Sequence, residues 1–224
     1  GGIAISEQSL EKHCIFCGKR PIDKNREHVI PRWAIEMTGD PKRECIFPTL
    51  SSDPKKRFYR FAFDQLQFPA CSTCNSDFSD LEEAVKQIIT RMIDHLPVAS
   101  NDLCLLLDWL DKVRIGLWLG IRCLDKNVSR IDPHFYIRDR IRSADRVACI
   151  MHTDAPSLRL ACQGVSTLAF RHQPSVFAIC INNINIYNIS NDFLISRRMG
   201  LPYPSQTEWL PSGATWMTLQ AGIE

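Results

Sequence analysis

The sequence predicts an α+β protein in which a cysteine-rich N-terminal module precedes a region of helices and antiparallel strands. The module is indicated by two CxxC pairs, at residues 14–17 and 71–74. The second region is indicated by apolar residues at helical spacing, followed after residue 131 by strand-like runs. We therefore expect a module at residues 1–96 and a C-terminal α+β region of unassigned role at residues 97–224.

Local patterns predict the individual elements. Ser79, with Glu82 three residues later, has the form of a capping box and predicts a helix that Pro97 ends. A second helix, apolar on nearly all sides, is expected over residues 101–126. Strands are expected over residues 146–152 and on both sides of the Asn-Asn turn at 182–183, which predicts a tight hairpin.

The composition argues against a membrane-spanning protein, and its overall charge does not indicate a nucleic-acid partner. With 224 residues, 45% of them apolar, the chain can bury a core. Its formal net charge is only +2, so overall charge does not indicate a nucleic-acid partner. The most apolar stretch, residues 103–121, carries four charged residues and predicts a buried helix rather than a membrane span. No signal peptide is visible, and we expect a cytoplasmic protein without a membrane partner.

The two CxxC pairs together supply four thiolates, the number that a closed tetrahedral zinc site needs. Cys14, Cys17, Cys71 and Cys74 are therefore predicted to hold one structural zinc ion. Such an ion contributes on the order of 10 kcal/mol to the folding of zinc-finger peptides. The alternatives are a redox-active CxxC, whose usual βαβ context is missing, and two unrelated pairs. The other six cysteines are expected to act as small hydrophobic residues.

Three polar residues lie close to these cysteines in the sequence. Glu27 and His28 follow the first CxxC pair, and Asn75 directly follows Cys74. A zinc ion shared by both pairs would bring them together near the start of a helix. A carboxylate and an amide oxygen suit Mg²⁺, and a neutral imidazole beside them can deprotonate water at pH 7. Taken singly, each residue is explained as well by an ordinary role: a surface carboxylate, a packed histidine and a helix cap.

The order CxxC, Glu-His-x-x-Pro and CxxC-Asn resembles the zinc-containing branch of the HNH nucleases, whose core is the ββα-metal fold. The resemblance covers about residues 12–95 and implies a metal-dependent endonuclease that hydrolyses phosphodiester bonds in DNA. By position it implies that His28 is the general base, that Glu27 and Asn75 bind a catalytic Mg²⁺ or Mn²⁺ ion, and that the cysteines hold zinc. Residues 57–63 would then be the second strand of the module. By analogy alone, the appended C-terminal region suits a role in phage defence or restriction.

One position departs from the family pattern. The family has an asparagine that orients the base about five residues before the third cysteine, where this sequence reads Asp64-Gln65-Leu66-Gln67. Gln65 is the nearest match and is the candidate for orienting His28. The alternatives are a backbone carbonyl in that role and a degenerate site.

Basic residues between the two halves of the motif are expected to contact a DNA backbone. Residues 12–60 hold twelve Lys or Arg against six Asp or Glu, and such clusters bind phosphate without reading sequence. A solvated loop surface explains the charge equally well. The expected contacts are Arg32, Lys42, Arg43, Lys55, Lys56, Arg57 and Arg60. The arginines of residues 138–146 are expected to lie on a salt-laced amphipathic helix or to form another DNA contact.

Two other classes of protein remain open. A non-catalytic zinc module would bind DNA or a protein without cleaving it. A thiol-redox protein would hold no tightly bound zinc and would carry reactive cysteines of low pKa. DNA is the expected partner in the nuclease interpretation. Three roles remain open for the C-terminal region: it reads DNA sequence, it dimerises, or it binds a protein partner.

Overall fold

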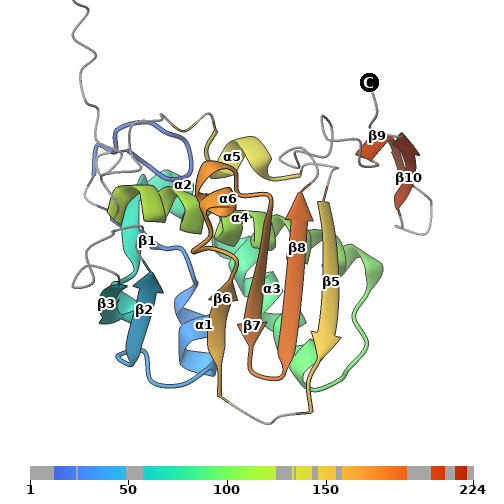
Figure 1. The fold of residues 1–224 in the computed structure, drawn as a ribbon, viewed down its shortest axis with the longest axis horizontal. Coiled ribbons are helices and arrows are strands. Elements are labelled where there is room, and N and C mark those ends of the chain that lie inside the picture. Colours follow the sequence, from blue (N-terminus) through green and yellow to red (C-terminus); the bar gives the residue numbers. More distant parts are fainter. Residues whose placement is uncertain are drawn as a thin grey trace, which may run out of the picture.

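The computed structural model describes residues 13–23, 25–48, 58–124, 133, 135–142, 146–154, 158–190, 203–209 and 215–220. Within them the fold is α+β, as the sequence predicts, and its strands form small antiparallel sheets (Figure 1). In chain order the elements are β1 Asn25–His28, α1 Arg32–Met37, β2 Glu44–Pro48, β3 Phe58–Ala62, the 3-10 turn η3 Phe63–Gln65, β4 Gln67–Ala70, α2 Ser72–Asp77, α3 Ser79–Ile93, α4 Ser100–Leu124, α5 Ile137–Arg140, β5 Arg146–His152, β6 Leu160–Gln163, α6 Leu168–His172, β7 Val176–Ile181, β8 Ile184–Ser190, β9 Tyr203–Trp209 and β10 Thr215–Gln220.

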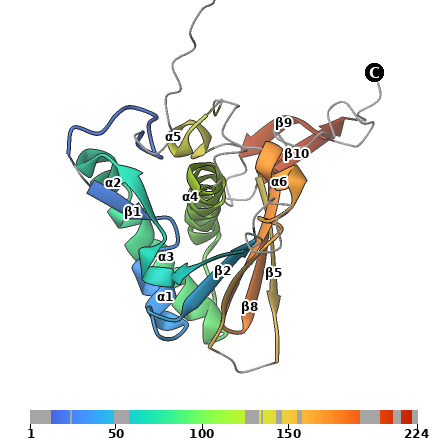
Figure 2. The ribbon, with the colours of Figure 1, turned by 60° about the vertical axis from the view of Figure 1, so that its left-hand side comes forward.

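Helix α4 lies at the centre of the molecule. Figure 2 shows it nearly end-on, between β1, α2 and α3 on one side and the β5–β8 sheet on the other. Every residue from 109 to 122 is buried, including the charged residues Asp111, Lys112 and Arg114. A helix that is covered on all sides is expected to be apolar all round, which is the pattern that predicted it. Its few charges must therefore find partners inside the protein.

The C-terminal strands form a four-stranded sheet in the order β5-β8-β7-β6. Strands β7 and β8 form the hairpin predicted from the Asn-Asn turn, with Asn182 at a φ of 53°. Asparagine tolerates this left-handed conformation, which a two-residue hairpin turn requires. The strand predicted at residues 146–152 is β5, which pairs with β8 along its whole length.

The N-terminal strands pair differently from the prediction. We expected residues 57–63 to be the second strand of the ββα unit, but β3 pairs with β2, and β1, which carries Glu27 and His28, pairs with β4. The register places Glu27 opposite Phe68 and His28 opposite Gln67. Strand β4 ends directly before Cys71, so the approach of the two CxxC pairs also brings β1 and β4 together. Helices α2 and α3 follow β4.

Helix α3 begins without the predicted capping box. The chain is already helical in α2, so Ser79 lies inside the first turn of α3 rather than at an N-cap, and its hydroxyl donates to the carbonyl of Ser76 at 2.7 Å. The helix ends at Ile93, before Pro97. His95, at a φ of 57°, turns the chain toward α4.

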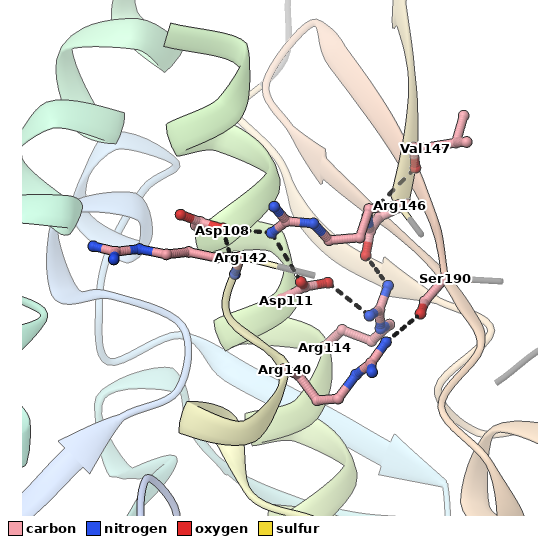
Figure 3. Close-up of polar contacts among 9 residues, drawn as sticks. Asp108, Asp111, Arg114, Arg140, Arg142, Arg146, Val147 and Ser190 are labelled. Carbon is pink, nitrogen blue, oxygen red and sulfur yellow. Dashed lines mark hydrogen bonds and ion pairs between the residues drawn. The ribbon is translucent and has the colours of Figure 1, made fainter. Parts of the chain in front are cut away.

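The arginines of residues 138–146 do not form the predicted amphipathic helix, because α5 is only four residues long. Arg146 instead turns inward and donates to Asp108 at 2.5 Å and Asp111 at 3.0 Å, and Arg140 donates to Ser190 at 3.0 Å (Figure 3). Arg114 of α4 joins the same group through Asp111 and Asn188. These contacts connect α4 and α5 to β5 and β8.

The apolar core is shared between the two halves of the chain. Buried residues of the N-terminal part, of α4 and of the β5–β8 sheet belong to one hydrophobic cluster. The division at residues 96/97 stays a prediction, and α4 packs against both sides of it. None of the helices in the described ranges is long and apolar enough to cross a membrane.

Candidate functional site

The four cysteines predicted to bind zinc come together in space. Their Sγ atoms all lie within 4.8 Å of one another, and those of Cys17 and Cys71 are 4.0 Å apart. Four sulfurs at about 2.3 Å from a tetrahedral zinc ion lie about 3.8 Å apart. The arrangement is therefore compatible with one structural zinc ion.

Local backbone contacts build this cluster. The N–H of Cys14 donates to the carbonyl of Lys19 at 2.8 Å, and the N–H of Gly18 donates back to the carbonyl of Cys14 at 2.8 Å. Gly18 has a φ of 71°, which closes this tight turn at little steric cost. The N–H of Cys71 donates to the sulfur of Cys14 at 3.3 Å, which joins the second pair to the first.

The crowding of the four thiols is compatible with a cation bound between them. Burial, together with the neighbouring thiols of Cys14 and Cys17, raises the pKa of Cys71 to about 11, and burial also raises the pKa of Cys74. Four thiolates so close together repel one another unless positive charge lies between them. A dication bound to all four sulfurs supplies that charge and lets the thiols ionise together.

His28 lies at the end of β1, half-buried. Its Nε2 is 2.8 Å from the side-chain nitrogen of Gln67, the residue opposite it on β4. An amide nitrogen can only donate, so Nε2 accepts and the ring proton lies on Nδ1. Nδ1 is buried and has no hydrogen-bond partner among the described residues. Burial, and next the charge of Arg32, lower the pKa of His28, so the ring is neutral at pH 7.

Gln67, rather than the predicted Gln65, is the glutamine beside His28. The Gln67 amide also donates to the carbonyl of Asp64 at 3.0 Å, which holds the side chain in place. Gln65 accepts from the N–H of Ala62 at 3.4 Å and belongs to the 3-10 turn before β4. Because β4 pairs residue for residue with β1, only Gln67 is in register with His28.

Glu27 points away from His28, into the protein. Its carboxylate accepts a hydrogen bond from the Lys112 ammonium, which also donates to Glu82 of α3. The side chain of Lys112 is 1% exposed, that of Glu27 7% and that of Glu82 24%. Burial raises the pKa of Glu27, and the charge of Lys112 opposes that increase. The contact joins α4 to β1 and α3, which lie on one side of α4 in Figure 2.

These residues do not fit the expected catalytic metal ion in this arrangement. Lys112 already supplies a cation to Glu27, and a second cation at the same carboxylate would meet its positive charge at close range. Asn75 lies on α2, partly exposed, and its backbone N–H donates to the carbonyl of Cys71 at 2.9 Å. No hydrogen bond joins its side chain to Glu27 or His28 within the described ranges. A Mg²⁺ or Mn²⁺ ion here would require Glu27 to leave Lys112.

The residues predicted to contact DNA differ from one another in exposure and in their partners. Lys42 is exposed. Arg32 and Arg60 are exposed and paired with Glu36 and Glu44, each at 2.7 Å. Arg43 is used inside the protein: it donates to the carbonyls of residues 35 and 40 and to the hydroxyl of residue 38, and it covers the ring of residue 63. Lys55, Lys56 and Arg57 lie outside the described residues.

Sequence reasoning missed four residues around this site. Gln67, Lys112 and Glu82 make the contacts described above, and Arg26 lies two residues before His28 on the same face of β1. The guanidinium of Arg26 donates to the carbonyl of Gln67 at 2.7 Å. It lines a groove of about 510 Å³ together with residues of β4 and the end of α4. Strand alternation could have found Arg26, but nothing in the sequence joins Lys112 to a glutamate 85 residues earlier.

No protein-family model matches the chain, and no curated protein or solved structure is significantly similar to it. The resemblance to the HNH nucleases therefore depends on the motif residues alone.

Proposed function

We propose that the chain is a zinc-stabilised endonuclease of the HNH kind, which hydrolyses phosphodiester bonds in DNA with His28 as the general base. The observation that carries the proposal is the environment of His28. A half-buried imidazole of lowered pKa, neutral at pH 7, lies on a strand next to a four-cysteine cluster. Neutral imidazole is the form that accepts a proton from an attacking water.

The neighbours of His28 suit this role. Gln67 fixes the plane of the ring, and the water to be deprotonated has to replace the Gln67 amide at Nε2. Arg26 lies on the same face of β1 beside a groove, where it can pair with a backbone phosphate. The cysteine cluster fixes the start of α2 relative to β1. We assign no step to a catalytic metal ion, because Glu27 is paired with Lys112.

A second function is favoured by that ion pair. With Glu27 buried and bound to Lys112, the same fold could serve as a non-catalytic zinc module that binds DNA or protein. This candidate predicts that the chain shifts DNA in a gel but leaves it intact.

Cleavage of supercoiled plasmid tests the first proposal. Purified protein is incubated with plasmid in Mg²⁺, in Mn²⁺ and without added metal, and wild type is compared with His28→Ala. We expect nicking or linearisation that His28→Ala reduces by about 100-fold or more, the lower range for general-base catalysis. Zinc content must be equal in both proteins. Equal cleavage by both would remove His28 from the mechanism, and DNA binding without cleavage would favour the second function.

The pH dependence of plasmid cleavage is a second test of His28 as the base. Protonation of His28 removes the base, and burial places its pKa below the ordinary value of about 6.5. The cleavage rate should therefore stay level from pH 8 to pH 7 and fall only below about pH 6.5. A rate that already falls between pH 8 and pH 7 would point to another base.

A further inference from the structure

Glu27 and Glu82 come from different elements, β1 and α3, yet their carboxylates meet at one point. Both lie within hydrogen-bonding distance of the same nitrogen, the ammonium of Lys112. The ammonium is almost completely buried and lies 5.8 Å from the ring centroid of Phe16. The cation at this point is therefore supplied by the chain itself, from α4.

The charges of this group do not balance. With both carboxylates ionised, their two negative charges exceed the single positive charge of the lysine, so the group would carry a net charge of −1 in a largely buried place. A divalent ion at the position of the lysine nitrogen would neutralise both carboxylates. Carboxylate oxygens are the ligands that Mg²⁺ and Mn²⁺ prefer. The Mg–O distance of about 2.1 Å is shorter than the N···O distance of a lysine hydrogen bond.

We propose that Glu27 and Glu82 form one cation site, and that Lys112 occupies it as a built-in competitor of divalent metal ions. The lysine and a metal ion exclude each other, because both need the same two carboxylates. Glu82 thereby becomes a member of the site, and α4 of the C-terminal region controls whether a metal ion can enter. The consequence for catalysis rests on the proposed function; the cation site itself does not.

Binding of Mn²⁺ to the zinc-loaded full chain tests this proposal without any cleavage assay. Wild type, Lys112→Gln and Lys112→Arg are titrated with Mn²⁺ by calorimetry, and free Mn²⁺ is followed by electron paramagnetic resonance. Glutamine removes the positive charge and keeps a polar side chain that is one atom shorter than that of lysine, whereas arginine keeps the charge. We expect Lys112→Gln to bind one Mn²⁺ at least tenfold more tightly than wild type, and Lys112→Arg to show no gain.

Two further variants identify the ligands. The double variant Glu82→Gln/Lys112→Gln should lose the gained affinity. Lys86→Gln, which removes an exposed lysine of α3 that is 3.8 Å from Glu83, should bind Mn²⁺ as wild type does. Zinc content is measured in every variant, so that Mn²⁺ at the cysteines is not counted.

Each outcome decides the proposal. A folded, zinc-loaded Lys112→Gln chain with no gain in Mn²⁺ affinity overturns it. So does a Lys112→Gln chain that stays unfolded with and without Mn²⁺, since a metal ion then cannot replace the ammonium. A variant that folds only when Mn²⁺ is added supports the proposal. If plasmid is not cleaved but Lys112→Gln gains Mn²⁺, the nuclease proposal fails and the cation site stands.

Discussion

At the scale of single residues, the contact between His28 and Gln67 determines how the imidazole can act. Gln67 is held on its other side by the carbonyl of Asp64, so its amide cannot turn freely. Because Nε2 carries the only free lone pair of the neutral ring, the imidazole can take a proton from a water only after this amide has moved away. The neighbouring carboxylate of Glu27 faces the opposite side of the strand and takes no part in this contact.

Replacement of Gln67 tests whether this contact matters. In Gln67→Leu no amide occupies the Nε2 lone pair of His28, so a water can bind there without displacing a side chain, and we expect plasmid cleavage at least as fast as in wild type. The matched control is Gln65→Leu, which alters an exposed glutamine whose side chain accepts a hydrogen bond from the N–H of Ala62 and makes none to His28 among the described residues. Zinc content should be unchanged in both. A loss of cleavage in Gln67→Leu would instead make Gln67 a positioning residue, and a loss in Gln65→Leu alone would reinstate the sequence-based assignment.

The site residues that could be predicted were those that form a short motif in the sequence. Two CxxC pairs are read directly from the sequence, and their four sulfurs do lie together. The partner of His28 could not be read, because it depends on which strand pairs with β1 and in which register. Arg43 looks like any basic residue in a charged loop, yet its donors are taken by carbonyls inside the protein.

At the scale of elements, two glycines of α4 set how closely this helix approaches the β1–β4 pair. A Cβ atom at Gly116 would lie 2.8 Å from Val29, and one at Gly120 would lie 2.4 Å from the ring of Phe68. Phe68 is the residue opposite Glu27. The same close approach therefore brings Lys112, four residues before Gly116 on α4, to Glu27.

Gly120→Ala tests this packing. Alanine improves helix propensity by about 1 kcal/mol, but an overpacked core costs about 1–3 kcal/mol. Because the contact is with an aromatic ring at 2.4 Å, we expect the overpacking to prevail and the free energy of unfolding in urea to fall. Phe68→Leu in the same chain makes room and should reduce the effect of the glycine replacement. Equal or higher stability of Gly120→Ala would show that the helix is free to move away.

Helices and the hairpin were predictable because their signals are local. The central helix follows from its apolar sequence, and the β7–β8 turn follows from two asparagines. The pairing of β1 with β4 was not predictable, since about forty residues separate the strands and β3 offers a competing aromatic run. The capping box failed because the chain before Ser79 is already helical.

In the whole molecule, α4 joins the N-terminal part of the chain to the β5–β8 sheet through charged residues on two sides of the helix. Lys112 faces the N-terminal glutamates, whereas Asp111 and Arg114 face the sheet (Figure 3). Burial raises the pKa of Asp111, and the nearby arginines oppose that increase. Removing one partner of such a buried pair typically costs 3–5 kcal/mol, because the other charge is left uncompensated. The halves are therefore expected to lose stability together.

A fragment of residues 1–96 tests that dependence. It keeps the four cysteines but lacks α4, which covers the apolar side of the β1–β4 pair and of α3. Even with Zn²⁺ added, we expect a broad thermal transition by circular dichroism and poorly dispersed amide resonances, in contrast to the full chain. A sharp, cooperative transition would instead make residues 1–96 an independent domain.

The position of α4 in the chain also has a consequence for biosynthesis. All four cysteines of the cluster are translated before the helix that covers β1 and β4. On the ribosome, zinc can thus be captured while Val29 and Phe68 still face water. The nascent chain thus passes through a stage in which all four cysteines are available and its apolar face is open. Such exposed surfaces are where chaperones bind and where unfinished chains aggregate.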